Sequence, residues 1–279
     1  MIIVETVSEL AEALNMMRHP GKAVGLVPTM GALHEGHASL VTKAGIENQI
    51  VVCSIFVNPT QFTDKKDLLN YPRTLHEDAI MLSDAGCDLL FTPSVKEIYP
   101  KDDLLDMDFG NLDKVMEGYY RPGHFKGVAT VVSRFFEIIR PHKAYFGEKD
   151  FQQLAIIRSL RARLFPSITI VGCETIRETD GLAMSSRNIH LSTEERAHAG
   201  IIYQTLLWSV KAIQTEPVDQ VKAQAIDRIS AVAGFRPQYL EFVDSETLQP
   251  INSWIMDGKQ RACVAVLASG TRLIDNIAM

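Results

Sequence analysis

Short apolar runs rich in β-branched residues recur along the first 175 residues, and stretches with helical spacing of their apolar residues lie between them. Continuous apolar runs of this length are typical of strands that are buried on both faces, as in a parallel sheet. The predicted strands are "KAVGLV" (22–27), "QIVVCSIFV" (49–57), "CDLLFT" (87–92), "KAYFG" (143–147) and "ITIVGCE" (168–174). The predicted helices are "HASLVTKAGIE" (37–47), "TLHEDAIMLSDAG" (74–86), "GVATVVSRFFEIIR" (127–140) and "DFQQLAIIRSLRARLF" (150–165). This alternation predicts an α/β domain with a Rossmann-like, doubly wound parallel sheet.

The pattern changes after about residue 175. Ser192 and Glu195 form a plausible capping box, and apolar residues at helical spacing then predict one long amphipathic helix over 192–214. The residues of that apolar stripe are Ile202, Leu206, Val210 and Ile213. A second helix (about 218–233) precedes two strand candidates, "YLEFVD" (239–244) and "ACVAVLA" (262–268). The sequence therefore predicts a larger domain (1–175) and a smaller α+β lid domain (176–279), with "TIRETDGLAMSSRN" (175–188) as a polar hinge.

Composition narrows the class of protein. Of the 279 residues, 46% are apolar and 22% are charged, which is ordinary for a globular protein, and the net charge of −6 argues against nucleic-acid or membrane-surface partners. The four cysteines are widely spaced in apolar contexts, which predicts buried reduced thiols. An acid at the fifth residue leaves no signal-peptide core, and apolar runs stop far short of the ~20 residues that cross a bilayer. We expect a cytoplasmic protein that acts on small molecules.

The stretch "VPTMGALHEGHASLV" (27–41) places two histidines three residues apart where a strand gives way to a helix. A glycine-containing turn of this kind leaves free backbone N–H groups and the positive end of a helix dipole facing one spot, which suits phosphate. The imidazoles of His34 and His37 can donate N–H bonds to phosphate oxygens as charge builds on a leaving pyrophosphate.

Two other interpretations of this stretch are open. A zinc protease needs H-E-x-x-H with histidines four apart, whereas these two are three apart with Gly36 between them. A purely structural role for both histidines is the stronger alternative. The sequence has neither G-x-G-x-x-G nor G-x-x-x-x-G-K-[ST], so it signals neither a dinucleotide fold nor a P-loop.

"PTMGALHEGHASLV" resembles the adenylate-forming signature of the pantoate–β-alanine ligases (pantothenate synthetases), a family of the HxGH nucleotidyltransferase superfamily. The resemblance continues in order through "FVNPTQF" (56–62), "YPRTL" (71–75), "RPGHFKGV" (121–128), "YFGEKDFQQL" (145–154), "DGLAMSSRN" (180–188) and "TRLIDN" (271–276). It implies a two-step reaction, in which (R)-pantoate attacks ATP to give pantoyl adenylate and pyrophosphate, and β-alanine then displaces AMP to give pantothenate. It also implies Mg²⁺ on the ATP phosphates, no dedicated protein metal site, and a homodimer formed through the larger domain.

The resemblance implies roles for particular residues. The catalytic residues are His34, His37 and Lys149. The ATP-binding residues are Met30, Gly31, Ala32, Leu33, His34, Glu35, Gly36, His37, Gly147, Glu148, Lys149, Asp150, Ile176, Met184, Ser185, Ser186 and Arg187. The residues that bind pantoate or β-alanine are Asn58, Gln61 and Gln153.

These residue types suit that chemistry. Lys149 follows a predicted strand, at the edge where α/β sheets bind ligands, and its ammonium can follow charge from the α-phosphate to pyrophosphate. The guanidinium of Arg187 offers a fixed fork of donors to a triphosphate, and side-chain amides donate and accept without adding charge near a dihydroxy acid. Asp150 is either a helix cap or a contact to ribose or metal. Glu77 and Asp78 are either metal contacts or solvated helix acids.

Three positions depart from the family's usual pattern. Lys65 and Lys66 stand where the family usually has glycine and acids, and Lys126 stands where arginine is common. None of these is a residue assigned to catalysis. Two other functions stay open: a nucleotidyltransferase that stops at an adenylate product, and a catalytically silent nucleotide-binding module.

Overall fold

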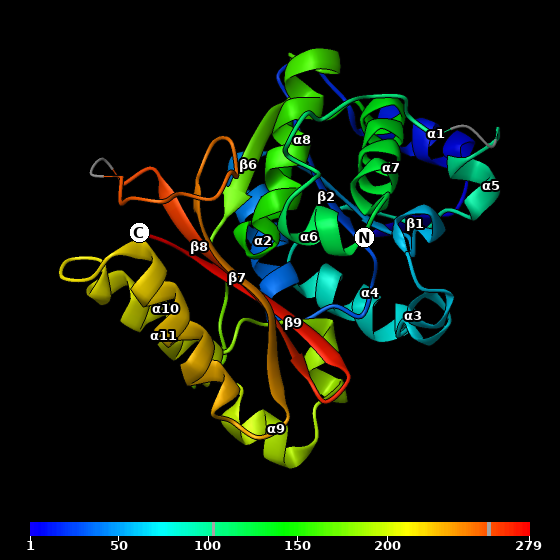
Figure 1. Ribbon diagram of the computed structural model, residues 1–279. Coiled ribbons are helices and arrows are strands. Elements are labelled where there is room, and N and C mark those ends of the chain that lie inside the picture. Colours follow the sequence, from blue (N-terminus) through cyan, green and yellow to red (C-terminus); the bar gives the residue numbers. More distant parts are fainter. Residues whose placement is uncertain (102–103, 256–257) are drawn as a thin grey trace. The chain divides into compact units, whose positions relative to one another are not determined.

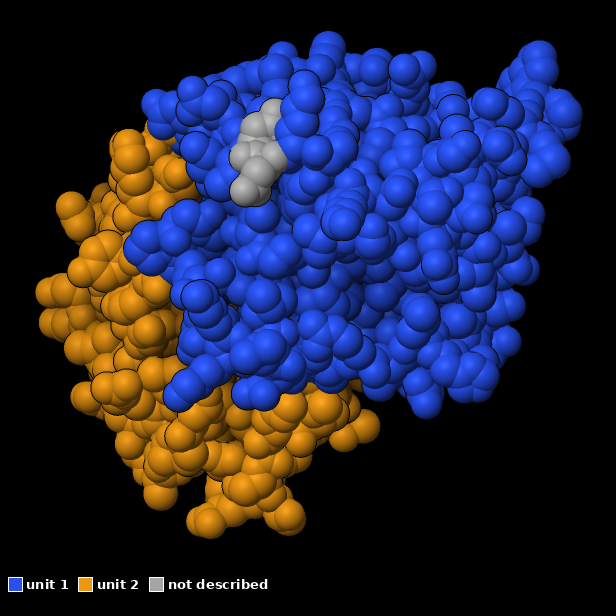
Figure 2. All heavy atoms as spheres, turned by 90° about the vertical axis from the view of Figure 1, so that its right-hand side faces the viewer, with its two compact units in different colours: residues 1–109, 121–148, 153–174 blue, residues 110–120, 149–152, 175–279 orange. Residues whose placement is uncertain are grey.

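The computed structural model describes residues 1–101, 104–255 and 258–279, which form two compact units (Figure 2). Unit 1 comprises Met1–Phe109, Arg121–Glu148 and Gln153–Glu174. Unit 2 comprises Gly110–Tyr120, Lys149–Gln152 and Thr175–Met279. Two short segments that precede residue 153 thus group with the C-terminal part. The functional division into a catalytic domain (1–175) and a lid domain (176–279) stays a prediction.

Unit 1 is built on a parallel sheet that has six strands in the described residues, in the order β1-β4-β3-β2-β5-β6 (Figure 1). The strands are β1 (Ile2–Val4), β2 (Val24–Thr29), β3 (Ile50–Ile55), β4 (Leu89–Phe91), β5 (Lys143–Gly147) and β6 (Thr169–Cys173). The five predicted strands are confirmed, and so is the doubly wound fold. β1 was not predicted because it has only three residues at an edge, and two of them, Ile2 and Ile3, are exposed.

Helices cover both faces of this sheet. The helices of unit 1 are α1 (Val7–Met17), α2 (Glu35–Glu47), η1 (Pro59–Gln61), α3 (Lys65–Asn70), α4 (Leu75–Asp84), α5 (Val95–Ile98), α7 (His124–Ile139) and α8 (Phe151–Leu164), whose first two residues group with unit 2. On one face, Val41 of α2 and Leu82 of α4 pack on Cys53 and its neighbours in a buried apolar cluster. Alternate residues of a strand point to the opposite face, where α7 contacts β2 and α1.

Unit 2 has an antiparallel sheet of three strands within the described residues, ordered β7-β8-β9, with two helices packed on it (Figure 1). Its elements are α6 (Met116–Tyr120), η3 (Ser186–His190), α9 (Thr193–His198), α10 (Ile201–Ala212), α11 (Val218–Ser230), β7 (Phe235–Asp244), β8 (Gln260–Ala268) and β9 (Thr271–Ala278), together with η2 (Glu148–Asp150) at its boundary. The core lies between α10, α11 and the sheet, and includes Leu206, Ile229 and Val264. The α+β fold is confirmed.

The prediction of one long helix over 192–214 is wrong, although its capping box is confirmed. Ser192 and Glu195 bond reciprocally at the start of α9, which ends at His198, and α10 begins at Ile201. A Cβ added at Gly200 would lie 2.8 Å from the backbone oxygen of Asp180, so the chain at the break packs closely on another segment. The apolar stripe begins only at Ile202, within α10, and none of the described residues of α9 is buried, so the stripe predicted α10 but gave no support for extending the helix back to Ser192.

All four cysteines lie among the described residues and are buried free thiols, as predicted. Burial raises the pKa of Cys87 and of Cys173 to about 11, which keeps both protonated and unreactive at neutral pH. No helix in residues 1–101, 104–255 or 258–279 is long and apolar enough to cross a bilayer.

Candidate active site

The histidine motif connects β2 to α2. β2 ends at Thr29, His34 is the N-cap residue, and α2 begins at Glu35. The turn requires left-handed backbone at two successive residues, Gly31 (φ 80°) and Ala32 (φ 50°). Glycine adopts this conformation at little cost, whereas alanine does so only where its surroundings hold it. Of the predicted residues, those from Met30 to His34 therefore form a sharp turn at the carboxyl end of β2, and Glu35, Gly36 and His37 form the first turn of α2.

The two histidines cap the helix through the same ring atom. Nδ1 of His34 accepts the N–H of Gly36 at 3.2 Å, and Nδ1 of His37 accepts the N–H of His34 at 3.4 Å. The ring centroids are 4.1 Å apart. Because Nδ1 accepts in both rings, each neutral imidazole carries its hydrogen on Nε2. The two histidines therefore have a structural role as caps of α2, and the capping bonds fix the tautomer in which Nε2 is the donor.

The turn does not leave all its backbone N–H groups for a ligand, contrary to the sequence-based expectation. The carboxylate of Asp78 accepts the N–H groups of Ala32 at 2.9 Å and Leu33 at 2.8 Å, and the hydroxyl of Thr74 at 3.1 Å. Asp78 is only 3% exposed, so it is not a solvated helix acid, whereas Glu77 beside it is exposed. Asp78 lies 45 residues after Leu33 in the chain, and no local sequence pattern predicts this contact.

We expect Asp78→Ala to lower the free energy of unfolding by about 2–6 kcal/mol, because two partly buried N–H groups lose their acceptor at roughly 1–3 kcal/mol each. Urea denaturation followed by circular dichroism measures the change. Glu77→Ala, on the exposed side of the same helical turn, is the matched control and should stay within about 0.5 kcal/mol of the parent protein. Equal stability of the two variants would contradict this account of the turn.

The second predicted group of site residues lies at the carboxyl end of β3. Asn58 is 1% exposed, and its amide donates to Oε1 of Gln61 (3.1 Å) and to the backbone oxygen of Gly127 (3.2 Å). Its carbonyl accepts the hydroxyl of Tyr99 at 2.7 Å. Both amide hydrogens of Asn58 are thus engaged within unit 1, in a geometry that orients Gln61. Nε2 of Gln61 lies 2.8 Å from Sδ of Met30, so the two predicted groups meet.

Sequence reasoning missed the residues that support Gln61 from α7 and α5. The ring Nδ1 of His124 lies 2.7 Å from the backbone oxygen of Gln61. A Cβ added at Gly127 would lie 2.3 Å from the backbone oxygen of Thr60, so only glycine allows α7 to approach η1 this closely. The block "RPGHFKGV" was the available signal, because it holds both residues. No sequence pattern indicated a role for Tyr99, which follows α5.

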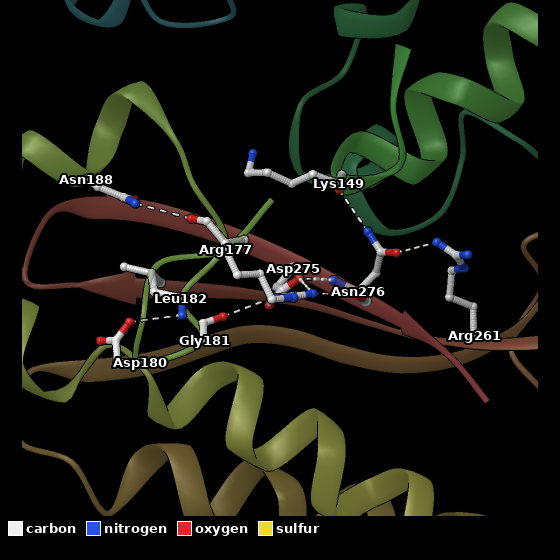
Figure 3. Close-up of polar contacts among 10 residues, drawn as sticks. Lys149, Arg177, Asp180, Gly181, Leu182, Asn188, Arg261, Asp275 and Asn276 are labelled. Carbon is white, nitrogen blue, oxygen red and sulfur yellow. Dashed lines mark hydrogen bonds and ion pairs between the residues drawn. The ribbon is translucent and has the colours of Figure 1, made fainter. Parts of the chain in front are cut away.

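The third group follows β5, which ends at Gly147 and leads into η2 with Glu148, Lys149 and Asp150. Nζ of Lys149 lies 3.7 Å from a carboxylate oxygen of Asp150. In Figure 3 the amine of Lys149 extends away from Asn276, whose side-chain amide donates to the backbone oxygen of the lysine at 2.8 Å. Gln153, also predicted, lies half-buried in the first turn of α8.

The fourth group lies in the predicted hinge, which unit 2 holds as a packed turn. The N–H of Met184 donates to the backbone oxygen of Ile176 at 3.0 Å, and Leu182 and Ala183 are buried. The middle of 175–188 is therefore buried rather than solvated, and the role of this segment as a hinge stays a prediction. The hydroxyl of Ser185 accepts the N–H of Arg187 at 3.3 Å and caps η3, which begins at Ser186.

The arrangement of strands in unit 1 indicates where a ligand binds. β2 pairs with β3 on one side and with β5 on the other, so the order of strands reverses between β2 and β5. In doubly wound sheets, ligands bind at this switch point, beyond the carboxyl ends of the strands. The histidine turn follows β2, and the chain reaches Lys149 two residues after β5. This fold and these residues define a nucleotide-binding α/β protein of the HxGH type.

Comparison with known proteins specifies the family. A family model described as pantoate-beta-alanine ligase matches residues 2–278, and the chain belongs to that family. A pantothenate synthetase of Bacteroides fragilis is 50% identical over 277 residues, 99% of this chain and 98% of the relative. One of Phocaeicola vulgatus is 51% identical over 278 residues, 99% of each chain.

Solved structures of relatives agree with the fold. A pantothenate synthetase of Thermus thermophilus has a TM-score of 0.92 at 45% identity, covering 100% of this chain and 99% of its own. A pantoate-beta-alanine ligase of Francisella tularensis, crystallised with "Beta-gamma ATP and Beta-alanine", has a TM-score of 0.81 at 34% identity, covering 100% and 97%. Across the described parts of the chain, no group of three or more histidine, cysteine, aspartate or glutamate side chains is arranged to hold a metal ion.

Proposed function

We propose that this protein is an ATP-dependent, AMP-forming ligase that condenses (R)-pantoate with β-alanine to give pantothenate. The observation that carries this function is the match to the pantoate–β-alanine ligase family over residues 2–278. The strand order supports it independently, because the histidine turn and the segment that leads to Lys149 follow the two strands that flank the switch point.

The first step forms pantoyl adenylate. A carboxylate oxygen of pantoate attacks the α-phosphorus of ATP, the bond to the bridging oxygen breaks, and its electrons leave with pyrophosphate. The Nε2–H groups of His34 and His37 and the ammonium of Lys149 stabilise the charge that develops on the departing phosphates. The capping bonds at Nδ1 support this role, since they hold both rings in the tautomer that donates from Nε2.

The second step forms the amide. The neutral amine of β-alanine attacks the acyl carbon, AMP leaves with the electrons of the acyl–oxygen bond, and the amine nitrogen loses a proton. The amides of Gln61 and Gln153 hold the hydroxyls and carboxylate of pantoate during both steps. Asn58 acts through Gln61, because its own amide hydrogens are engaged inside unit 1.

Nucleotide contacts complete the proposed site. The triphosphate takes the remaining donors of the Met30–His37 segment and the residues around η2 and η3, with the guanidinium of Arg187 on phosphate oxygens. Mg²⁺ supplies charge neutralisation on those oxygens, and the carboxylate of Asp150, whose side chain is 46% exposed, is a hard donor that fits this ion or the ribose. The residues 176–279 act as a lid that keeps water from the adenylate.

The function is tested by the substrates that AMP formation requires. The protein is supplied with ATP, Mg²⁺ and (R)-pantoate, with and without β-alanine, while AMP and pyrophosphate are followed. The ligase turns over AMP only when both pantoate and β-alanine are present. Sustained pyrophosphate release without β-alanine would identify a nucleotidyltransferase, and absence of both products would identify a silent binding module. Sedimentation of the same preparation tests the proposed homodimer, and fractionation of cells tests the proposed cytoplasmic location.

A further inference from the structure

We propose that two adjacent residues of β9, Asp275 and Asn276, position the ATP-binding parts of unit 2. Asn276 fixes the backbone of Lys149, and Asp275 fixes the turn that carries the Ser185–Arg187 segment. Neither residue is proposed to touch substrate. The inference rests on the proposed function of Lys149 and of that segment, and it explains why the last strand of the chain bears buried polar groups.

The carboxamide of Asn276 has a single possible orientation. Its Nδ2 donates to the backbone oxygen of Lys149 at 2.8 Å, and its Oδ1 accepts Nη1 of Arg261 at 2.5 Å (Figure 3). A guanidinium can only donate and a backbone oxygen can only accept, so the two contacts together exclude the flipped amide. The guanidinium of Arg261 also lies 3.9 Å from the ring centroid of Phe151. The chain is thus held at Lys149 and again two residues later.

Asp275 makes the corresponding contact with the other segment. Asp275 is 4% exposed, and its carboxylate accepts Nη1 of Arg177 at 2.6 Å and Nη2 at 3.0 Å. Nη1 of Arg177 also donates to the backbone oxygen of Gly181 at 3.1 Å, and the guanidinium lies 3.7 Å from the ring centroid of Tyr203. Arg177 forms an isolated bridge with Ala183, so fixing its side chain fixes both sides of the turn.

The geometry of a strand explains why adjacent residues serve two segments. Successive side chains of a strand point to opposite faces, so Asp275 and Asn276 reach in different directions from one rigid support. β9 pairs with β8 without a register shift, with Asp275 opposite Val264 and Asn276 opposite Cys263. Sites that are held by paired strands keep catalytic groups in place more accurately than sites on loops.

β9 also supplies a control of the same chemical type. Arg272 binds the buried carboxylate of Glu117 through two bonds, at 2.7 and 2.6 Å, and the hydroxyl of Tyr239 donates to that carboxylate at 2.8 Å. This ion pair ties β9 to α6, which contains none of the predicted site residues. Glu117→Gln keeps the backbone N–H that Gln152 accepts at 3.0 Å, so it weakens the folded protein through β9 without removing a contact to the Lys149 segment or to Arg177.

The test of Asn276 is a double-mutant cycle with Lys149. Pyrophosphate release in a single turnover, at saturating ATP and pantoate, is measured for Asn276→Ala, Lys149→Ala and the double variant. We expect Asn276→Ala to slow adenylate formation roughly 10- to 100-fold, the cost of displacing a catalytic group by about 1 Å. It should cause no further loss when Lys149 is already alanine, because its effect acts through the lysine. Glu117→Gln should keep the parental rate.

The outcomes separate the inference from the function on which it rests. Equal slowing by Asn276→Ala in both backgrounds, or a normal rate for Asn276→Ala beside a slow Lys149→Ala, would overturn the positioning role alone. A normal rate for Lys149→Ala would overturn the proposed role of the lysine.

For Asp275, we expect Asp275→Asn and the milder Arg177→Lys to raise the KM for ATP about 10-fold with a smaller change in kcat. An unchanged KM for ATP in a folded Arg177→Lys variant would overturn the positioning role of Asp275.

Discussion

Replacement of Lys149 by alanine is expected to slow formation of pantoyl adenylate by at least about 100-fold, the usual effect of removing a donor aimed at developing charge. The side chain of Lys149 is 18% exposed, and Asp150 lies 3.7 Å from its Nζ. Its proposed place beyond β5 puts an ammonium where negative charge moves from the α-phosphate to pyrophosphate. The loss should appear in kcat more than in the KM for ATP, because the interaction strengthens in the transition state.

Rapid-quench measurement of pyrophosphate release without β-alanine isolates this step. Lys149→Arg keeps the charge with a different shape, and we expect it to recover only part of the rate, because a planar fork does not replace a compact ammonium. Lys96→Ala, an exposed lysine of α5, is the control for loss of one positive charge and should leave the rate unchanged. Adenylate formation at a near-normal rate in Lys149→Ala would refute the role assigned to this lysine.

The parts of the fold that could be predicted are those that produce a local pattern of apolar and polar residues in the sequence. The four inner strands appear as apolar runs because they lie between neighbouring strands and are largely buried, and β6, at an edge, still keeps the apolar run of 168–173. The cap of α9 appears as Ser192 followed by Glu195. β9 did not appear, since Asp275 and Asn276 interrupt its apolar pattern and are buried only because Arg177 and Arg261 meet them. A strand whose polar residues are paired by distant partners has no signature of its own.

The same distinction applies to the site. The histidine turn was recognisable because its glycines, histidines and helix are contiguous, and the other blocks were recognisable by resemblance. The residues that hold those blocks were not. Asp78 contacts the turn from 45 residues away, and Asn276 contacts Lys149 from 127 residues away. The general expectation of free N–H groups in the turn failed at Ala32 and Leu33 for this reason, because the sequence of the turn does not show the carboxylate that folds against it.

The capping bonds of the histidines allow their structural and chemical roles to be separated. Serine is among the best N-cap residues, so His34→Ser keeps an acceptor for the first N–H groups of α2 but has no ring N–H. We expect His34→Ser to retain stability within about 0.5 kcal/mol of the parent, because the cap is preserved. We expect the same variant to slow adenylate formation about 100- to 1000-fold, as when one donor to a developing anion is lost.

Two comparison variants complete this test. His34→Ala removes the cap as well, so it should show the same loss of rate and an additional loss of about 1 kcal/mol in stability. Thr6→Ala removes the capping box of α1, and should lower stability by a similar amount while the rate stays unchanged. If His34→Ser formed adenylate at the parental rate, the imidazole would be a helix cap and nothing more, and charge stabilisation would have to come from Lys149 and the remaining donors alone.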